Sequence, residues 1–279
     1  MKLKKIVSLA TSVVLSTSLL VGCSGKNKGK GGNVSNEKAT LKIGMITDVA
    51  GVNDQSFNQS AWEGLQKSKE ELGVEVTYLE SKQDSDYAAN IETFVDEGVD
   101  LILGVGAKLA PAIEEGAGLY PDQKFVIVDA ELPSDIKNVK SILFNSQEAA
   151  YLVGLIAGKM TETNKVGFIG GMESSAVKKF NFGFQQGVAY ANENLGTNVS
   201  LKDENIVYSG SFSDLALGQQ LAAQMYDSGV KAIFAAAGGV GTGVITEAKT
   251  RVVNGEEVWV IGVDSDQYAD GISEGEKSV

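Results

Sequence analysis

The stretch KFVIVDAELPSDIKNVKSILF, residues 124–144, decides which α/β fold the sequence encodes. Two apolar runs, KFVIVD and VKSILF, are separated here by only nine residues, AELPSDIKN. A helical crossover between parallel strands needs a dozen or more residues, so no helix fits in this interval. A (β/α)8 barrel would place a helix there. The interval therefore indicates that the chain leaves one sheet near this point and enters a second.

On both sides of this stretch, short apolar runs alternate with helical patterns. The runs are aliphatic and β-branched without strict alternation, as expected of strands covered on both faces. Most intervals between them carry apolar residues at helical spacing, for example Phe57, Trp62, Leu65 and Leu72. This succession predicts an α/β protein with parallel sheets. The nine expected strands are LKIGMI, VEVTYL, DLILGV, KFVIVD, VKSILF, KVGFIG, ENIVYS, KAIFAA and VWVIGV.

The change of sheet divides the chain into two predicted lobes. We expect residues 40–145 to form an N-terminal lobe and residues 146–263 to form a C-terminal lobe. Residues 264–279 would begin a return to the first lobe. They end where no further element has been completed, so we expect the C-terminal return segment to be missing and the chain to be a fragment of a longer protein.

The N-terminus has the pattern of an exported lipoprotein. A basic start, MKLKK, precedes the apolar run IVSLATSVVLSTSLL, which is too short for a membrane-spanning helix. The run ends in LVGC, which resembles a bacterial lipobox with Cys23 as the lipidated residue; the alternative is a plain signal peptide with a chance cysteine. We predict a signal peptide over residues 1–22, a flexible tether over 23–39, and a lipid-anchored location on the extracytoplasmic side of the cell membrane.

Composition excludes several classes of function. Acidic residues outnumber basic ones by 36 to 24, which gives a formal net charge of −12 and argues against nucleic acid as a partner. There is no histidine, so most Ser-His and Cys-His nucleophiles and His-metal sites are excluded. The single cysteine, Cys23, allows no internal disulfide. We expect no metal and no cofactor.

The residues that follow the strands are the candidate binding groups, because ligands of open parallel sheets bind beyond the carboxyl ends of the strands. Three of these ends carry an aspartate: Asp48, Asp129 and Asp264. Three others carry glycine-rich turns, GVGAK, GGMESS and AGGVGTG. A carboxylate accepts hydrogen bonds from paired hydroxyls, and a glycine lets backbone N–H groups approach a ligand. For any single aspartate the alternative is a helix cap.

A capping box is predicted at the first strand-to-helix junction. The segment SFNQ would place Ser56 at the N-cap and Gln59 at the third helical position, with Asp54 just outside the helix N-terminus, where it complements the dipole. Phe57 and Asn58 then lie in the first helical turn. Phe57 is either a core residue or a platform for a flat ring, and Asn58 offers both a donor and an acceptor to a heterocycle.

Two further segments are candidate ligand contacts. The glycines of AAAGGVGTGV fit neither the dinucleotide nor the phosphate-loop spacing, so a tight turn that lines a cleft is favoured there. In KKFNFGFQQGV, Phe180 and Phe184 share one helix face. One of them is either a second ring platform or, like its neighbour, a core residue.

Five blocks in the same order resemble the basic membrane protein family of bacterial lipoproteins: TDVAGVNDQSFNQSAWEGL, FVIVD, KKFNFGFQQGV, AAAGGVGTGV and VIGVDSDQ. They cover about residues 39–267. Members are substrate-binding proteins of ABC transporters, similar to the purine nucleoside receptors of spirochaetes. The resemblance implies a type I periplasmic-binding-protein fold, with two doubly wound parallel-sheet lobes joined by a hinge.

The resemblance also implies site residues. The base of a nucleoside would be held between Phe57 and Phe180, with Asn58 and Asp129 near the base. The ribose would meet Asp48, Gly238 or Gly239, and Asp264. Relatives continue past GVDSDQ with elements that return to the first lobe and with a lysine that contacts the ligand, and this chain lacks them.

These observations favour a lipid-anchored monomer that captures a nucleoside, purines being favoured, and delivers it to an ABC permease without chemistry. Three alternatives stay open at this point: a lipid-anchored nucleoside hydrolase that uses the carboxylates, a binding protein of the same fold for a sugar or other polyol, and a surface interaction protein.

Overall fold

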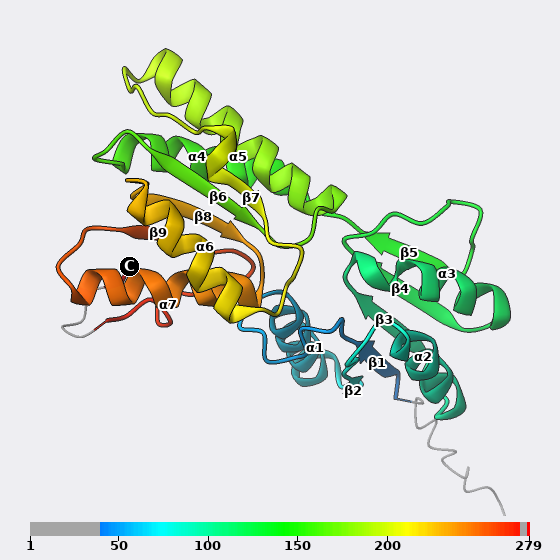
Figure 1. The fold of residues 1–279 in the computed structure, drawn as a ribbon. Coiled ribbons are helices and arrows are strands. Elements are labelled where there is room, and N and C mark those ends of the chain that lie inside the picture. The colour runs from blue at the N-terminus through cyan, green and yellow to red at the C-terminus, as the bar shows by residue number, and fades with distance from the viewer. Residues whose placement is uncertain (1–39, 274–277) are drawn as a thin grey trace, which may run out of the picture. The chain divides into compact units, whose positions relative to one another are not determined.

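The computed structural model describes residues 40–273 and 278–279. The first five strands form one parallel sheet in the order β2-β1-β3-β4-β5 (Figure 1). The next four form a second parallel sheet in the order β7-β6-β8-β9. The strands are β1 (Lys42–Ile46), β2 (Glu75–Leu79), β3 (Leu101–Val105), β4 (Lys124–Val128), β5 (Val139–Ile142), β6 (Val166–Gly170), β7 (Ile206–Tyr208), β8 (Ala232–Ala236) and β9 (Trp259–Ile261).

Helices follow most of these strands, as the sequence predicts. Both sheets belong to one compact unit, Ala39–Val279. The prediction of an α/β protein with two parallel sheets is confirmed, with each of the nine expected strands present. The helices are α1 (Phe57–Leu72), α2 (Asp86–Asp96), α3 (Ala110–Leu119), α4 (Ser146–Met160), α5 (Ser175–Asn194), α6 (Leu215–Asp227) and α7 (Gly239–Val253), with the 3-10 turns η1 (Ala107–Leu109) and η2 (Asp203–Asn205).

The first sheet is covered on both faces, which explains its continuous apolar runs. Ile46, Ile102 and Ile127 pack with residues of α2 and α3 in one buried cluster. Met45 and Val105 pack with Phe57 and other residues of α1 in a separate cluster. Because successive side chains of a strand point to opposite faces, neighbours such as Met45 and Ile46 enter different clusters.

Glycines bring the helices of the second sheet into close contact. Figure 1 shows α4 and α5 side by side on one face and α6 and α7 on the other. A methyl group added at Gly187 of α5 would collide with the carbonyl oxygen of Tyr151 of α4. One added at Gly218 of α6 would collide with the carbonyl oxygen of Val240 of α7. The helix backbones are therefore in direct contact at these glycines, and larger residues at these positions would separate them.

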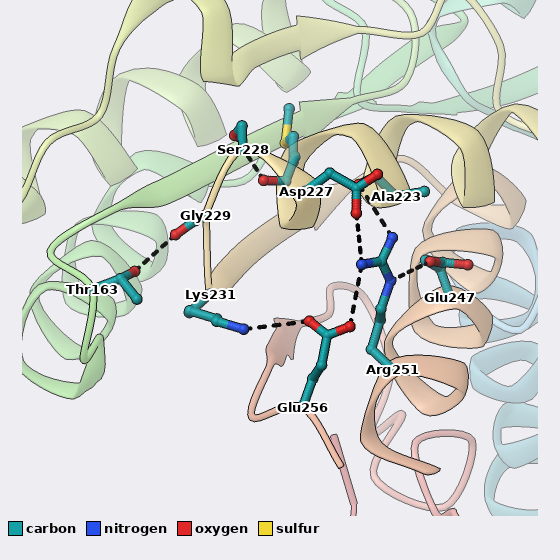
Figure 2. Close-up of polar contacts among 10 residues, drawn as sticks. Thr163, Ala223, Asp227, Ser228, Gly229, Lys231, Glu247, Arg251 and Glu256 are labelled. Atoms are coloured by element: carbon teal, nitrogen blue, oxygen red, sulfur yellow. Dashed lines mark hydrogen bonds and ion pairs between the residues drawn. The ribbon is translucent and has the colours of Figure 1, made fainter. Parts of the chain in front are cut away.

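The single arginine of the sequence, Arg251, fastens the far end of α7 (Figure 2). Its guanidinium donates to Asp227 at the end of α6, at 2.7 Å, and to Glu247 one turn back on α7, also at 2.7 Å. It also reaches Glu256 in the loop before β9, at 3.2 Å, and Lys231 lies 3.4 Å from the same carboxylate. Hydrogen bonds to these three carboxylates hold the pKa of Arg251 above its usual value.

The chain does not change sheets between β4 and β5, where the sequence predicts that it does. Residues 130–138 do not lead out of the first sheet, because β5 pairs with β4 in parallel, with Phe125 opposite Val139. Nine extended residues span up to about 30 Å, so they can return along the length of a five-residue strand without a helix. Leu132 and Ile136 of this segment pack against the core. The chain changes sheets after β5, through residues 143–145, next to the predicted lobe boundary at Asn145.

Several predictions concern residues outside the described ones. The signal peptide over residues 1–22, the tether over 23–39 and the lipidated Cys23 lie there, and so do residues 274–277 of the predicted return segment. Among residues 40–273 and 278–279, none of the helices is long and apolar enough to cross a membrane.

Candidate functional site

A cavity lies where loops after the strands of both sheets meet. Its volume is about 240 Å³, just below the range of about 300–1,000 Å³ that small-molecule sites occupy. It therefore suits a compact ligand. Seven of the eight predicted ligand-binding residues line it: Asp48, Phe57, Asn58, Asp129, Phe180, Gly238 and Asp264. Whether they bind a ligand stays a prediction.

Gly239, the eighth predicted residue, is the first residue of α7 and does not line the cavity. Its backbone N–H donates to the carbonyl of Phe212 at 2.8 Å. Gly238, the preceding residue, has a positive φ of 56° and lines the cavity. Between the two glycines, the structure therefore brings Gly238 to the site and uses Gly239 in the helix start.

Asp54, and not Ser56, caps the first helix. The Asp54 carboxylate accepts backbone N–H groups from Ser56, Asn58 and Gln59 at 2.9–3.0 Å. Ser56 occupies the N-cap position without a capping bond from its side chain, and the Gln59 amide donates to Glu63 instead. The predicted capping box is therefore wrong, because a carboxylate of higher charge takes the same N–H groups. The prediction that Asp54 stands at the helix N-terminus is confirmed.

Asn58 is held by two aspartates. Its side-chain Nδ2 donates to Asp48 Oδ1 at 2.9 Å and to Asp54 Oδ2 at 3.0 Å. Asn58 is buried, and its Oδ1 has no hydrogen-bond partner among the described residues. The two ends of the amide thus differ: the donor end is fully used and the acceptor end is free.

Asp48 follows β1 and is buried, and one of its two carboxylate oxygens accepts hydrogen bonds from the protein. Oδ1 accepts from the Ala50 backbone N–H at 3.0 Å as well as from Asn58. Burial raises the pKa of Asp48, while these two hydrogen bonds act in the opposite direction. Gly106, after β3, lies beside this carboxylate: its φ of 106° is readily adopted only by glycine, and a Cβ there would lie in van der Waals contact with Asp48 and Phe57.

Asp264 links the segment after β9 to the start of α1. Its Oδ2 accepts from the Ser56 hydroxyl at 2.5 Å, and its backbone oxygen accepts from Ser60 at 3.3 Å. By surface area the residue is exposed, yet protein atoms of the cavity wall surround its carboxylate. Loss of solvation by these walls raises the pKa of Asp264 to about 6; the Ser56 bond opposes this shift, and Asp54 and Asp129 add to it.

Asp129 is the third cavity aspartate that follows a strand. Its backbone N–H donates to the Ile142 carbonyl at 2.9 Å, which anchors it between β4 and β5. Partial burial raises its pKa, and Lys179 opposes this shift. Asp129 and Asp264 both adopt positive φ values, 57° and 67°. This conformation is costly for residues other than glycine and is found preferentially at functional sites.

Three phenylalanines line the cavity. Phe57 comes from α1 and Phe180 from α5, where its ring packs edge-on against Phe234 with centroids 6.0 Å apart. Phe184 is fully buried in the core, and Phe182 is 61% exposed on the outside of α5. Of the two phenylalanines that share one face of α5, Phe180 therefore reaches the cavity and Phe184 does not.

The third ring, Phe212, was missed from the sequence. It lies between β7 and α6, in a loop without apolar periodicity, and only its neighbourhood to Gly238 and Gly239 marks it. Lys108 and Met172 also line the cavity; they belong to the glycine-rich turns GVGAK and GGMESS, but the sequence did not single them out as contacts. Lys108 follows the GVG turn after β3, and its Nζ pairs with Asp84 at 3.3 Å. Among residues 40–273 and 278–279, no group of three or more Cys, Asp or Glu side chains could hold a metal ion.

Comparison with known families identifies the relatives of this chain. Residues 41–274 match the family model Bmp, described as ABC transporter substrate-binding protein PnrA-like. The CD4+ T-cell-stimulating antigen of Listeria monocytogenes is 41% identical over 276 residues, which cover 96% of this chain and 75% of that protein. The ABC transporter nucleoside-binding protein BmpA of Lactococcus lactis is 40% identical over 271 residues, or 95% of this chain and 74% of that protein.

Solved structures agree with this assignment. A solute-binding protein of an ABC transporter system from Aeropyrum pernix matches with a TM-score of 0.76 and 32% identity, over 82% of this chain and 64% of that one. LsrB from Clostridium saccharobutylicum, solved with AI-2, shares the fold alone, with a TM-score of 0.61 and 14% identity. The type I periplasmic-binding-protein fold predicted from the sequence is confirmed.

The comparisons also decide between an enzyme and a binding protein. The family description is of ABC transporter substrate-binding proteins, and basic membrane protein A of Borreliella burgdorferi is 35% identical over 257 residues, or 91% of this chain and 70% of that protein. The prediction of binding without chemistry is confirmed, and the hydrolase alternative is set aside. The chain belongs to the PnrA-like, or basic membrane protein, family of ABC transporter substrate-binding proteins.

Proposed function

We propose that this protein captures a nucleoside, with purines favoured, in the cavity between its two sheets and delivers it to an ABC permease. The observation that carries the proposal is the joint presence in one cavity of Phe57 from one lobe, Phe180 from the other, and four aspartates, three of which follow strands. A flat ring suits the phenylalanines, and hydroxyls suit the carboxylates. A nucleoside combines both.

The energetics favour a ligand with both parts. Stacking on an aromatic ring contributes about 1–3 kcal/mol per base in nucleic-acid binding, and two faces are available here. A hydrogen bond to a charged group contributes about 1.5–3 kcal/mol. Within residues 40–273 and 278–279, Asp48 Oδ2 and Asp264 Oδ1 accept no hydrogen bond from the protein, so both can accept from the hydroxyls of a ribose. The nucleoside-binding name of the Lactococcus relative supports the same class of ligand.

In this proposal the two lobes, residues 40–145 and 146–263, close on the ligand by a hinge motion. Contacts from both lobes to one ligand favour the closed form by as much as their binding energy differs between the two forms. The lipobox-like LVGC supplies a lipid anchor at Cys23, which keeps the monomeric receptor at the extracytoplasmic face of the membrane.

A thermal-shift panel tests the ligand class. A ligand that binds only the folded state raises the melting temperature by mass action. Inosine and guanosine are expected to raise it, whereas ribose and hypoxanthine at the same concentration are not. A shift with sugars but not with nucleosides would replace the proposal by the polyol-binding alternative.

Metabolic labelling tests the anchor. Because Cys23 is the only cysteine, Cys23→Ser removes every thiol from the chain. We expect incorporation of labelled palmitate and recovery in the membrane fraction with the unmodified chain, and neither with Cys23→Ser. Equal labelling of both would contradict the anchor at this residue.

A further inference from the structure

The backbone of Gln55, in the turn before α1, has an unfavourable conformation. Its φ of 54° lies in the left-handed region, which residues other than glycine, asparagine and aspartate rarely adopt. Asp129 and Asp264 share this feature, but they line the cavity, whereas Gln55 does not. Such a conformation persists only where surrounding contacts hold it. The contacts that hold Gln55 therefore indicate what the turn does.

These contacts come from the segment that leaves the second sheet. The Gln55 carbonyl accepts from the Gln267 amide at 3.0 Å and from the Ser265 hydroxyl at 3.1 Å. The oxygen of the Gln267 amide accepts from the Val263 backbone N–H at 3.2 Å. Gln267 thus joins the segment after β9 of the second sheet to the turn before α1, a helix that packs on the first sheet.

The Gln267 amide fits in one orientation only. Turning it over would place its oxygen against the Gln55 carbonyl oxygen and its N–H groups against the Val263 N–H. Gly262 leaves the room for this amide, because a Cβ at residue 262 would collide with Gln267 Oε1. Since Oε1 is at the end of a flexible side chain, a methyl group there would displace the amide and leave the backbone in place.

The conformation of Gln55 decides whether the cap of α1 forms. Asp54 precedes Gln55 in the chain, and the backbone N–H groups that the Asp54 carboxylate accepts all follow it. The dihedral angles of Gln55 therefore determine whether the carboxylate reaches these groups. The cap in turn sets the first turn of α1, from which Phe57 and Asn58 line the cavity.

We propose that Gln267 is a positioning residue that couples closure of the protein around its ligand to the shape of the α1 start. The inference rests on the proposed function and adds a control of the same site. With the Gln267 bond formed, Gln55 stays left-handed and Phe57 and Asn58 line the cavity. When the two sheets move apart, the bond breaks and the turn relaxes to an ordinary conformation. Gln267, Ser265 and Gln55 do not line the cavity, so they act through α1.

Two variants break the Gln267 contact in different ways. Gln267→Glu keeps the size of the side chain and an acceptor for Val263 but removes the donor to Gln55, and Gly262→Ala displaces the amide. Titration calorimetry is expected to show each variant binding inosine at least about fivefold more weakly than the unmodified chain. A smaller loss in either variant overturns the inference. Gly64→Ala is the matched control, since its methyl group would lie in open space on α1, and it should keep the affinity.

A change at Gln55 separates positioning from a merely structural role. Glycine adopts positive φ values about as readily as negative ones, so Gln55→Gly makes the turn less dependent on Gln267. In this background Gln267→Glu should weaken inosine binding by less than about twofold. A larger loss would mean that Gln267 acts by a route other than the Gln55 turn, and would overturn the inference.

Hydrogen exchange tests the same coupling without a ligand. The backbone N–H groups capped by Asp54 should exchange at least about threefold faster in Gln267→Glu and Gly262→Ala than in the unmodified chain, and no faster in Gly64→Ala. Equal rates in all four proteins overturn the inference. If the unmodified chain does not bind inosine, the proposed function is contradicted, and the exchange rates still decide the inference. If it binds and neither the affinities nor the rates change in the variants, the proposed function stands and the inference alone fails.

Discussion

The Ser56 hydroxyl donates a hydrogen bond of 2.5 Å to the Asp264 carboxylate, across 208 residues of sequence. The bond joins the start of α1 to the segment that follows β9. Nearby, the Ser265 hydroxyl and the Gln267 amide both donate to the Gln55 backbone carbonyl, at 3.1 Å and 3.0 Å. A cavity carboxylate is thereby tied to the same turn that carries Phe57 and Asn58.

The pH dependence of stability follows from the raised pKa of Asp264. Its folded-state pKa of about 6 lies above the ordinary value of 3.8, so the folded state holds this proton more tightly than the unfolded state. Stability from this group is therefore present below pH 4 and is lost as pH rises from about 4 to about 6. Because the residue is partly exposed, we expect a loss of only about 1 kcal/mol.

Urea unfolding at pH 4.5 and pH 7, compared between the unmodified chain and Asp264→Asn, measures this contribution. The free energy of unfolding is expected to fall less between pH 4.5 and pH 7 in the variant than in the unmodified chain. Burial raises the pKa of Asp48 and Asp129 as well, and both act with the same sign, so part of the fall should persist in the variant. An identical fall in both proteins would contradict the role of Asp264.

If both phenylalanines stack on the base, removing either ring should lower the affinity for a nucleoside by a similar amount. Phe57→Ala and Phe180→Ala should each weaken inosine binding by about 1–3 kcal/mol, whereas Phe182→Ala, which removes an exposed ring on the same helix as Phe180, should leave it unchanged. Titration calorimetry checks all three. If Phe180→Ala is silent and Phe212→Ala is not, the second stacking face belongs to Phe212 and the prediction for Phe180 is wrong.

The charge of the cavity predicts rejection of phosphate esters. Four aspartates line it, and Lys108 is already paired with Asp84. Like charges brought together without compensation cost several kcal/mol, so inosine 5′-monophosphate should bind at least about tenfold more weakly than inosine. Raising the ionic strength should reduce this difference in affinity, because salt screens the repulsion between the phosphate and the aspartates. Equal affinity of the two compounds at low salt would argue against an acidic binding surface.

Arg251 predicts a variant that separates stability from binding. Arg251→Met removes the hydrogen bonds that hold α6, α7 and the loop before β9 together, and should lower the free energy of unfolding by about 1–3 kcal/mol. Twelve residues of helix separate Arg251 from the cavity end of α7, a rise of about 18 Å, so the affinity for inosine should not change. Chemical unfolding and calorimetry on the same preparation test both halves.

The sequence predicted central strands such as β6 and β8 well because they are buried on both faces, and a doubly covered strand appears as a continuous apolar run. The edge strands β2 and β5 are more exposed, but they too carry aliphatic residues. The sequence indicated cavity residues such as Asp48 and Asp129 because they follow strands, whereas Phe57, Asn58 and Phe180 lie in helices and were assigned to the ligand through the family resemblance. It failed where the partner is distant in sequence. The spacing of Ser56 and Gln59 indicates a capping box, but Ser56 bonds Asp264 instead, and no local pattern contains that information.

The prediction that the chain changes sheets between β4 and β5 is wrong for a related reason. The length of AELPSDIKN rules out a helix but does not determine which strand the next run pairs with, and pairing is settled by tertiary contacts such as those of Leu132 and Ile136. Phe212 lacks a sequence signal because its loop has no periodicity. Its place in the cavity depends on two glycines distant in sequence: Gly171 lies against its ring, and Gly238 lies against its backbone carbonyl.

The central claim is that one nucleoside binds with its base against Phe57 and its ribose against the aspartates. The most direct measurement is a calorimetric titration of the unmodified chain with inosine, ribose and hypoxanthine at pH 7.5, repeated with Phe57→Ala. We predict saturable one-to-one binding of inosine, binding of neither fragment at the same concentration, and a loss of affinity in the variant. Binding of ribose as tight as that of inosine, unaffected by Phe57→Ala, would contradict the account.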